Sequence, residues 1–320
     1  MRKLIIILGL LAAVAAVAVA MSERGRWRLE VLSWKATGNL PVMSWPEVVR
    51  GLFRCDAEPC IDKIARSAVT IIEFDSDNPC PVLWKTPLGP IRGLFEDHPV
   101  LEHFTAHSWI VDPAAPRVKQ GDIVLEVGAW LGSFTRAALN QGAALVVAME
   151  PEPINRSCFE QTFASEIESG RVKVIGKAAW DHAGAVKMAN LGPNAVEGSH
   201  KGFAVADEGP VDAEAITIDE LVETLNLERV DFLEMDIEGG ESLALQGARR
   251  TLQRFRPTIV ACIHHLPGDR EEVPRTILEI EPSYEVETTK LQGYFRPVPA
   301  AAHTRVRTVA EAESSAQISH

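Results

Sequence analysis

The 320-residue sequence lacks features that mark several common protein classes. It has no excess of positive charge, since 32 Lys and Arg residues stand against 44 Asp and Glu, a formal net charge of -12. A general nucleic-acid binder needs a cationic surface to displace counterions from phosphates, so this composition disfavours nucleic acid as a partner. No internal repeat is visible. The hydrophobic content of 46% is too high for a wholly disordered chain.

Cysteine is also scarce. The chain has five cysteines, at positions 55, 60, 80, 158 and 262. An odd number in a chain long enough to bury a proper core predicts packed or exposed thiols rather than a disulfide framework. No Cys-x-x-Cys pair occurs, so the sequence gives no support for a zinc knuckle.

Charge is absent from one long stretch, Leu4–Met21, which reads LIIILGLLAAVAAVAVAM. As a helix it would extend roughly 27 Å, enough to cross a hydrocarbon core. Arg2 and Lys3, the apolar run and Ala18-Val-Ala20 near its end together also match a cleavable signal peptide. Four basic residues between positions 24 and 35 outnumber Arg2 and Lys3, and the more positive flank tends to stay cytoplasmic. We expect an uncleaved single-pass anchor with a cytoplasmic catalytic domain; the alternative is export after cleavage.

The remaining chain divides into three parts. Residues 22–115 form a juxtamembrane and accessory region with a small α/β extension, in which a strand is expected at Val82–Thr86. Residues 116–299 form the main domain. Residues 300–320 are rich in Ala, Ser and Glu without a periodic apolar face, and we predict a disordered tail.

In the main domain, short apolar runs alternate with helical stretches. This pattern predicts an α/β domain with a doubly wound parallel sheet covered on both faces. The expected strands are Ile123–Leu125, Leu145–Met149, Val172–Ile175, Phe232–Met235 and Ile259–Ile263, and the expected helices are Ser133–Asn140, Ile154–Glu168, Asp219–Leu225 and Glu241–Phe255.

A glycine-containing turn follows the first strand. The segment Glu126–Gly132 (EVGAWLG) leads into the helix at Ser133, and Glu150 ends the next strand. Glycines at such a turn let the backbone approach a ligand, and the helix start supplies free N–H groups. An acidic side chain at the second strand end can accept the two hydroxyls of a ribose. Together these features indicate a nucleoside-binding site.

The glycine pattern selects among nucleoside cofactors. A dinucleotide fingerprint requires glycine at positions 128, 130 and 133, but the chain has Trp130 and Ser133. S-adenosylmethionine has no phosphate and tolerates a looser pattern, so we predict this cofactor. A nucleotide-linked oxidoreductase on the same fold is the alternative, and Trp130 argues against it.

A second motif is more specific. Asp231–Glu241 (DFLEMDIEGGE) ends a strand and begins a helix that contains Gly247-Ala248. This chain resembles the FkbM family of methyltransferases, which carries such an acidic strand end. Val211–Leu221 (VDAEAITIDEL) and Gly121–Ala129 (GDIVLEVGA) are similar to two further family segments. The resemblance implies a Rossmann-like class I fold and S-adenosylmethionine-dependent O-methylation of a hydroxyl on a glycan, a lipid headgroup or a secondary metabolite.

The resemblance also implies roles for individual residues. The residues expected to contact the methionine end of the cofactor are Glu126, Gly128, Ala129 and Gly132. Glu150 is expected at the ribose. The residues expected around the adenine are Ala179, Trp180 and Asp181. Asp236 and Glu238 correspond to the acidic pair beside the transferred methyl, with Glu238 contacting the substrate.

The resemblance does not identify the proton acceptor, because this chain has His264 and His265 where the family more often has a glutamate. Both follow the strand Ile259–Ile263, so we predict one of them as the general base. Asp236 then orients the substrate or binds a divalent ion. The alternatives are that His264 only ends a strand, and that Glu241 is a helix-start acid favoured by the dipole. A non-catalytic scaffold with the same fold is a further alternative.

Overall fold

The computed structural model describes residues 69–86, 88–97, 101, 115–190 and 203–298. The predicted membrane segment 1–21, the predicted tail 300–320, Cys55 and Cys60 lie outside the described residues. Within these ranges, no helix has the length and apolar character needed to cross a bilayer.

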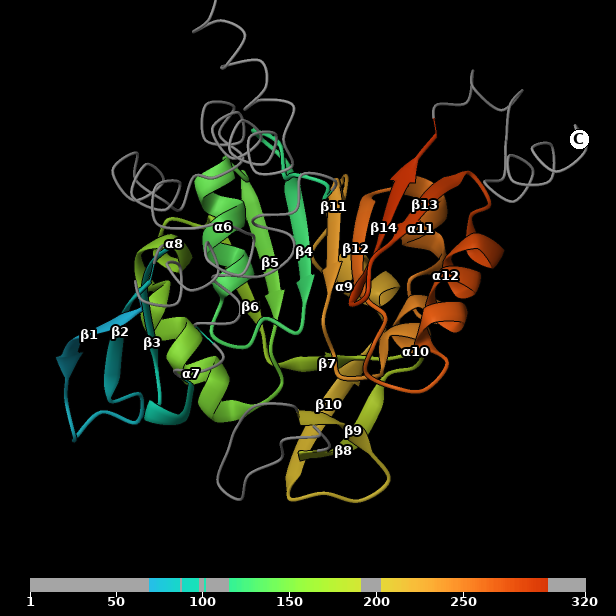
Figure 1. Ribbon diagram of the computed structural model, residues 1–320. Coiled ribbons are helices and arrows are strands. Elements are labelled where there is room, and N and C mark those ends of the chain that lie inside the picture. The colour runs from blue at the N-terminus through green and yellow to red at the C-terminus, as the bar shows by residue number, and fades with distance from the viewer. Residues whose placement is uncertain (1–68, 87, 98–100, 102–114, 191–202, 299–320) are drawn as a thin grey trace, which may run out of the picture.

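The main sheet of the described chain has seven strands in the order β13-β14-β12-β11-β4-β5-β6 (Figure 1). Neighbouring strands are parallel except at β14, which is antiparallel to both β12 and β13. The five predicted strands are confirmed, and β13 and β14 were not predicted. The bounds are β4 Ile123–Val127, β5 Leu145–Met149, β6 Val172–Ile175, β11 Phe232–Met235, β12 Thr258–Cys262, β13 Tyr284–Thr288 and β14 Gln292–Pro297.

Two of the four predicted helices of the main domain are each divided into two, and α12 was not predicted. Predicted helix 154–168 is divided at Phe163, and predicted helix 241–255 is divided at Gly247-Ala248. A Cβ on Gly247 would lie 2.2 Å from the Trp180 carbonyl oxygen, so the close passage of these two segments requires glycine there. The helices are α6 Ser133–Gln141, α7 Pro153–Thr162, α8 Ala164–Glu168, α9 Ile218–Thr224, α10 Glu241–Gln246, α11 Arg249–Phe255 and α12 Asp269–Ile280.

Alternate residues of the central strands face opposite layers of helices. Val146 and Ala148 of β5 pack in one cluster with side chains of α6 and α7. Val147 and Met149 of the same strand pack in another cluster with side chains of α9, α10, α11 and α12. A strand buried on both faces explains why these runs are continuously hydrophobic. The predicted doubly wound, Rossmann-like α/β fold is therefore confirmed.

A smaller sheet was not predicted. Its strands run in the order β7-β10-β8-β9, with β7 parallel to β10 and the other pairs antiparallel. Figure 1 shows this sheet beyond the carboxyl ends of β4, β5 and β11, where it covers that edge of the main sheet. The bounds are β7 Lys177–Ala179, β8 Gly184–Asn190, β9 Phe203–Ala206 and β10 Val211–Ile216.

The described accessory region is a three-stranded antiparallel sheet followed by a short 3-10 helix. The strands are β1 Thr70–Phe74, β2 Val82–Thr86 and β3 Gly89–Gly93, and the helix η1 is Phe95–Asp97. The predicted strand Val82–Thr86 is confirmed. This sheet packs on α7 through a cluster that contains Trp84, Ile91 and Leu131.

One disulfide joins the accessory sheet to the main domain. Cys80, just before β2, is bonded to Cys158 on α7, with Cα atoms 5.4 Å apart. The prediction of free thiols is wrong for these two residues, because folding brings together cysteines 78 positions apart in a way that their count does not reveal. Cys262 is a buried free thiol, as predicted.

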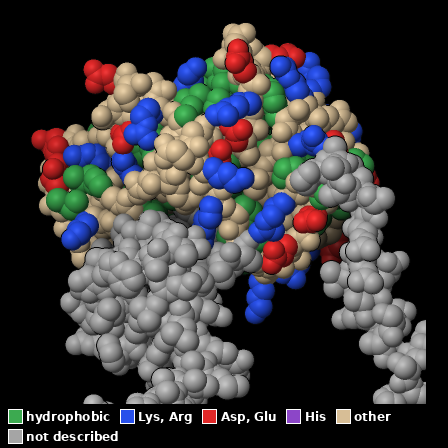
Figure 2. All heavy atoms as spheres, turned by 90° about the horizontal axis from the view of Figure 1, so that it is seen from above, with side chains coloured by type: hydrophobic (Ala, Val, Ile, Leu, Met, Phe, Trp, Pro, Cys, Tyr) green, Lys and Arg blue, Asp and Glu red, His purple; other side chains and the backbone are tan. Residues whose placement is uncertain are grey.

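The opposite edge of the main sheet has a different surface. Figure 2 views the molecule from above Figure 1 and shows Lys and Arg side chains interspersed with Asp and Glu. On the visible part of this face, hydrophobic side chains lie in small groups between the charges. The concave site described below lies at the other edge, beside the smaller sheet.

Candidate active site

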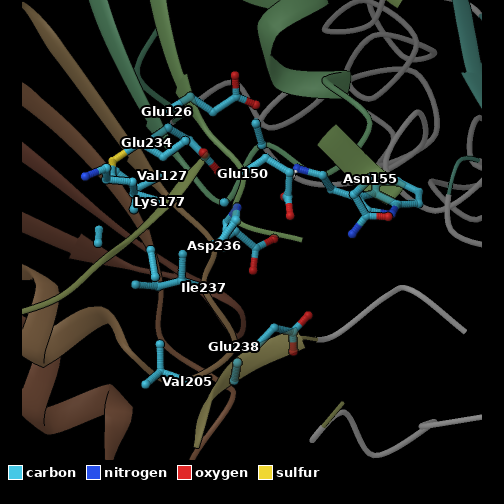
Figure 3. Close-up of a pocket in the computed structure, with 18 of the residues that line it drawn as sticks. Glu126, Val127, Glu150, Asn155, Lys177, Val205, Glu234, Asp236, Ile237 and Glu238 are labelled. Carbon is cyan, nitrogen blue, oxygen red and sulfur yellow. Dashed lines mark hydrogen bonds between the residues drawn. The ribbon is translucent and has the colours of Figure 1, made fainter. Parts of the chain in front are cut away.

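A pocket lies where the carboxyl ends of β4, β5 and β11 meet the smaller sheet. Its open volume, including the mouth, is about 970 Å³. Ligands of open α/β sheets bind at this edge. Figure 3 shows the carboxyl groups of Glu126, Glu150, Glu234 and Asp236 around the same space. The wall from the smaller sheet includes Lys177, Trp180, Met188, Ala204 and Val205.

The turn after β4 forms the floor of the pocket. Gly128 has φ +95°, and a Cβ there would lie 2.1 Å from the carbonyl oxygen of Asp236. Glycine is required, because it lets the ends of β4 and β11 approach each other. Gly128 and Ala129 both line the pocket, in agreement with their predicted place. Gly132 is not among the lining residues; it is the N-cap residue of α6.

Glu126 lies on β4 at the base of the pocket and is 1% exposed. Its carboxyl accepts a hydrogen bond from the Thr135 hydroxyl of α6. Burial raises the pKa of Glu126 to about 8, although that hydrogen bond acts in the opposite direction. The group is therefore largely protonated at neutral pH.

Glu150 directly follows β5 and is held by backbone donors. One carboxyl oxygen accepts a hydrogen bond from the backbone N–H of Trp130 at 2.7 Å, and the other accepts one from the backbone N–H of Glu152 at 2.9 Å. Burial raises the pKa of Glu150 to about 7, although these bonds and a side-chain hydrogen bond with Asn155 act in the opposite direction. The contacts fix the carboxyl at the pocket wall.

Two of the three residues predicted near the adenine lie at the pocket. Ala179, the last residue of β7, and Trp180, which follows it, both line the pocket. Asp181 is not among the lining residues, and its carboxylate contacts His182 Nδ1 at 2.6 Å. The structure therefore brings the first two predicted residues together with Glu150 and leaves Asp181 outside.

At the end of β11, acidic and histidine side chains form a network. His265 Nε2 lies 3.2 Å from Asp236 Oδ1 and 3.7 Å from Glu238 Oε2, while His265 Nδ1 lies 3.0 Å from Glu241 Oε1. Glu241 is fully buried and also accepts hydrogen bonds from the N–H groups of Ile237 and Gly239, each at 3.0 Å. Asp236 and Glu238 line the pocket, and Glu238 has a left-handed backbone, φ +58°.

These contacts set the charges of the network. Burial disfavours a charged His265, but hydrogen bonds to Asp236 and Glu241 outweigh it and raise the pKa of His265 to about 11. Burial likewise opposes ionisation of Asp236, yet the hydrogen bond from His265 leaves the pKa of Asp236 below its usual value. The pair is therefore an imidazolium and a carboxylate at neutral pH.

The two predicted base candidates occupy different environments. His264 is exposed, and its Nδ1 lies 3.0 Å from the Leu291 carbonyl oxygen. Its ring packs beside that of His265, with centroids 4.4 Å apart. Only His265, of the two, contacts a pocket carboxylate, and neither histidine is among the lining residues.

Two groups of described side chains have the composition and spacing of metal ligands. One is Cys262, His264 and His265; the other is Asp236, Glu241 and His265, with ligand atoms within 4.8 Å in each group. Both oxygens of Glu241 already accept backbone hydrogen bonds, so the second group is held together without an ion. Metal binding by Asp236 stays a prediction.

Three site residues were not predicted. Ser133 Oγ and the Glu234 carboxyl face the pocket from the start of α6 and from β11, and Glu241 orients His265. Ser133 Oγ is buried and has no hydrogen-bond partner in the described structure. The sequence did contain a signal for Glu234, since an acidic residue within an otherwise apolar strand is rarely buried without a partner.

Comparisons with known proteins agree with this geometry. The Methyltransferase FkbM domain family matches residues 122–300, more than half of the chain. The hexuronic acid methyltransferase AglP of Haloferax volcanii is 29% identical over 174 residues, covering 54% of this chain and 67% of AglP.

Two solved structures are also similar to parts of this chain. The FkbM methyltransferase of Methylobacillus flagellatus has a TM-score of 0.45 and 19% identity over 62% of this chain, which spans about half, 52%, of that protein. Aeropyrum pernix fibrillarin with bound S-adenosyl-L-methionine has a TM-score of 0.37 and 12% identity, covering 58% of this chain and 70% of fibrillarin. With its family match and its pocket, the chain belongs to the FkbM family of S-adenosylmethionine-dependent methyltransferases.

Proposed function

We propose that the protein transfers a methyl group from S-adenosylmethionine to a hydroxyl of a glycan or glycolipid. The observation that carries this proposal is the position of Asp236, which lines the pocket directly beside the Gly128 turn and is kept ionised by His265. A carboxylate at that point can orient a hydroxyl toward a methyl donor and take its proton.

The pocket fits the cofactor on its own polar groups. Ser133 Oγ is a buried donor without a partner in the described structure, and Glu150 presents a fixed carboxyl suited to a ribose diol. Gly128 and Ala129 supply the close backbone beside the methionine end. When bound, the cofactor supplies a methyl on a positively charged sulfur, and the protein aligns the acceptor with it and excludes water.

The proton is taken by Asp236 in this proposal rather than by a histidine. An imidazolium with a pKa near 11 has no free lone pair at neutral pH, so His265 serves to hold Asp236 in place. When a bound cofactor supplies its methyl group to the acceptor oxygen, Asp236 would take the hydroxyl proton. Glu238, at the mouth of the same site, contacts the acceptor.

Two observations support a glycan or glycolipid acceptor. AglP is a hexuronic acid methyltransferase, and the pocket wall formed by Met188, Ala204 and Val205 combines apolar surface with the Lys177 ammonium group. The net charge of -12 argues against nucleic acid as the acceptor. A secondary metabolite with a sugar-like hydroxyl is the other acceptor class.

We also propose that Leu4–Met21 tethers the enzyme to a membrane, with the catalytic domain on the cytoplasmic side, where the methyl donor is made. The basic residues at positions 24–35 support this orientation. The Cys80–Cys158 disulfide supports the alternative, an exported domain, because disulfides persist in oxidising compartments. The intact mass of the mature protein shows whether the N-terminal segment is cleaved. Protease accessibility in sealed vesicles shows on which side of the membrane the catalytic domain lies.

The reaction is tested with purified full-length protein, S-adenosylmethionine carrying a labelled methyl, and glycan or glycolipid extracts of membranes. We expect a labelled product with an O-methyl group, identified by mass spectrometry. Label on a carboxylate or an amine contradicts O-methylation. Binding of the cofactor without transfer to any acceptor indicates the non-catalytic scaffold, and binding of NAD in its place indicates the oxidoreductase.

A further inference from the structure

The turn that precedes α6 lies between the pocket and the accessory sheet, and methyl transfer alone does not explain its shape. Trp130 has a left-handed backbone, with φ +46°, although it is not a glycine. A bulky side chain makes this conformation unfavourable, so it persists only where the surrounding structure holds it. The backbone of Trp130 therefore indicates that neighbouring segments keep this turn in one particular shape.

One side of the turn belongs to the pocket. Trp130 lines the pocket, and its backbone N–H donates the 2.7 Å hydrogen bond to the carboxyl of Glu150. Glu150 is 6% exposed, and the backbone N–H of Glu152 is a further donor to the same carboxyl. Fixed donors of this kind set the orientation of a buried carboxyl. A different backbone conformation at Trp130 would therefore change how Glu150 presents its oxygens to a ligand.

The other side of the turn packs against the accessory region. Leu131 is 1% exposed and belongs to the cluster that contains Trp84 and Ile91 of the accessory sheet. Trp130 packs against the same cluster. A Cβ on Gly93, the last residue of β3, would lie 2.7 Å from Cδ1 of Leu131, so the backbone of this strand lies directly against Leu131. The accessory sheet therefore supplies contacts that hold the turn in place.

The accessory sheet is attached to the main domain close to this turn. The Cys80–Cys158 disulfide joins the residue chain before β2 to α7, and Cys158 belongs to the cluster that contains Leu131. The backbone N–H of Arg92 on β3 donates a hydrogen bond to the Thr162 hydroxyl of α7 at 2.8 Å. Figure 1 shows β3 beside α7. One covalent and one noncovalent link thus fix the sheet on the helix that packs behind the turn.

We propose that the accessory sheet, attached to α7 by its disulfide, sets the selectivity of the cofactor pocket for a ribose. It acts through Leu131, which keeps the backbone N–H of Trp130 directed at Glu150. Leu131 is thus a positioning residue, whereas Glu150 is the group that contacts the ligand. The inference rests on the proposed cofactor and on the proposed place of its ribose at Glu150. It assigns the accessory region a part in cofactor recognition.

The experiment measures ribose selectivity as a ratio of two dissociation constants. The ligands are S-adenosylhomocysteine and its 2′-deoxy analogue, which lacks one ribose hydroxyl, and each is titrated calorimetrically into the full-length protein. Leu131→Ala removes the contact with the accessory sheet, and Leu131→Met keeps a side chain of similar volume. Leu252→Ala is the matched control, because Leu252 is a fully buried leucine of α11 that belongs to another core cluster and does not line the pocket.

We expect wild-type protein to bind S-adenosylhomocysteine about 10- to 100-fold more tightly than the 2′-deoxy analogue, the range for a hydrogen bond to a charged group. Leu131→Ala lowers this ratio by about 10-fold, because Glu150 is no longer held in one orientation. Leu131→Met and Leu252→Ala keep the ratio within about twofold of wild type. If Leu131 only stabilises the fold, Leu131→Ala and Leu252→Ala give the same ratio, and that result overturns the proposal.

Reduction tests the contribution of the disulfide. Dithiothreitol passes two electrons to the bond, each cysteine sulfur gains a proton, and the reagent is oxidised to its cyclic disulfide. We expect the ribose selectivity of reduced wild-type protein to fall, and reoxidation to restore it. Cys80→Ser lacks the bond, so dithiothreitol leaves its ratio unchanged, which controls for the other cysteines. An unchanged ratio in fully reduced wild-type protein, verified by intact mass, contradicts the part assigned to the disulfide.

Two further results separate this inference from the proposed reaction. Wild-type protein that binds S-adenosylhomocysteine and its 2′-deoxy analogue equally well contradicts the inference, whatever the protein methylates. Protein that prefers the ribose, and loses this preference in Leu131→Ala, but transfers no methyl group contradicts the proposed reaction and leaves the inference standing.

Discussion

Two carboxyl clusters meet at the end of β11, and their pKa values shift in opposite directions although both are buried. Glu234 faces Glu126 of β4, no cationic side chain among the described residues acts on Glu234, and the pKa of each is raised. Asp236, two residues later, faces His265, and its pKa is lowered although burial also opposes its ionisation. His265, oriented by Glu241, has the largest lowering effect, and Cys262 and His264 add smaller ones.

The difference indicates that the two clusters have different roles in the same pocket. The Asp236 cluster carries its own counterion and is ready as a carboxylate before any ligand arrives. The Glu126–Glu234 pair has no counterion among the described residues, and ionisation of both carboxyls is disfavoured. The carboxylate of Asp236 is thus preorganised, whereas the two carboxyls at the base of the pocket have no such partner.

Removing the carboxylate of Asp236 gives the largest expected effect. We expect Asp236→Asn to lower turnover by about 10²- to 10⁴-fold, because an amide cannot take the hydroxyl proton. Cofactor affinity, measured by calorimetry, changes little. Transfer of labelled methyl groups measures turnover, with Glu287→Gln, a change of an exposed carboxylate on β13, as the control. Turnover close to wild type would show that Asp236 is not the proton acceptor.

Removing His265 makes the surroundings of Asp236 more like those of Glu126 and Glu234. We expect His265→Gln to lower turnover by about 10- to 100-fold at neutral pH, since Asp236 then loses its closest cationic partner. The pKa of Asp236 rises, so the acidic limb of the pH–rate profile moves to higher pH. His264→Gln is the matched comparison and moves the profile much less, because His264 is exposed and its electrostatic effect on Asp236 is the smaller one.

A profile that moves equally for both histidine variants, or for neither, contradicts the role of His265. Equal movement assigns the effect to general loss of positive charge at this edge of the sheet. Movement for neither means that another group keeps Asp236 ionised.

The two clusters also give opposite contributions to stability as the pH changes. The folded-state pKa of Glu126 is about 8 against an ordinary value of 4.5, so its contribution is complete below pH 4.5 and is lost as the pH rises toward 8. The pKa of Asp236 is lowered from 3.8, so its contribution is present above that pH and is lost only in stronger acid.

We therefore expect Glu126→Gln to become more stable relative to wild type as the pH rises from about 5 to about 8, by roughly 3 kcal/mol. Urea unfolding of the ligand-free proteins at both pH values measures the difference. A constant difference across this range shows that Glu126 does not titrate there.

The sequence predicted the strands that position this pocket, because the periodicity of strands and helices is a local property of the chain. The five predicted strands are confirmed, and the acidic residues at their ends, Glu150 and Asp236, line the pocket as expected. The Gly128 turn was predicted for cofactor contact. Its close approach to the Asp236 carbonyl gives a further reason why no side chain fits there.

What the sequence did not predict depends on contacts between distant segments. The smaller sheet, the Cys80–Cys158 bond and the pairing of Glu126 with Glu234 all join positions far apart in the chain. Glu241 was considered a helix-start acid, and it does begin α10. Its bond to His265 becomes apparent only when β12 is placed beside β11.

The smallest expected effect concerns metal ions. Asp236 was predicted either to orient the acceptor or to bind a divalent ion, and the Asp236 carboxylate already has His265 as a charged partner 3.2 Å away. If orientation is its role, treatment with EDTA followed by gel filtration changes turnover by less than about twofold, because an imidazolium already neutralises the carboxylate. Loss of activity that added Mg²⁺ or Mn²⁺ restores would instead mean that a metal displaces His265 from Asp236. In that case Asp236, like Glu234, has no cationic side chain of the described protein as its partner, and the contrast between the two clusters disappears.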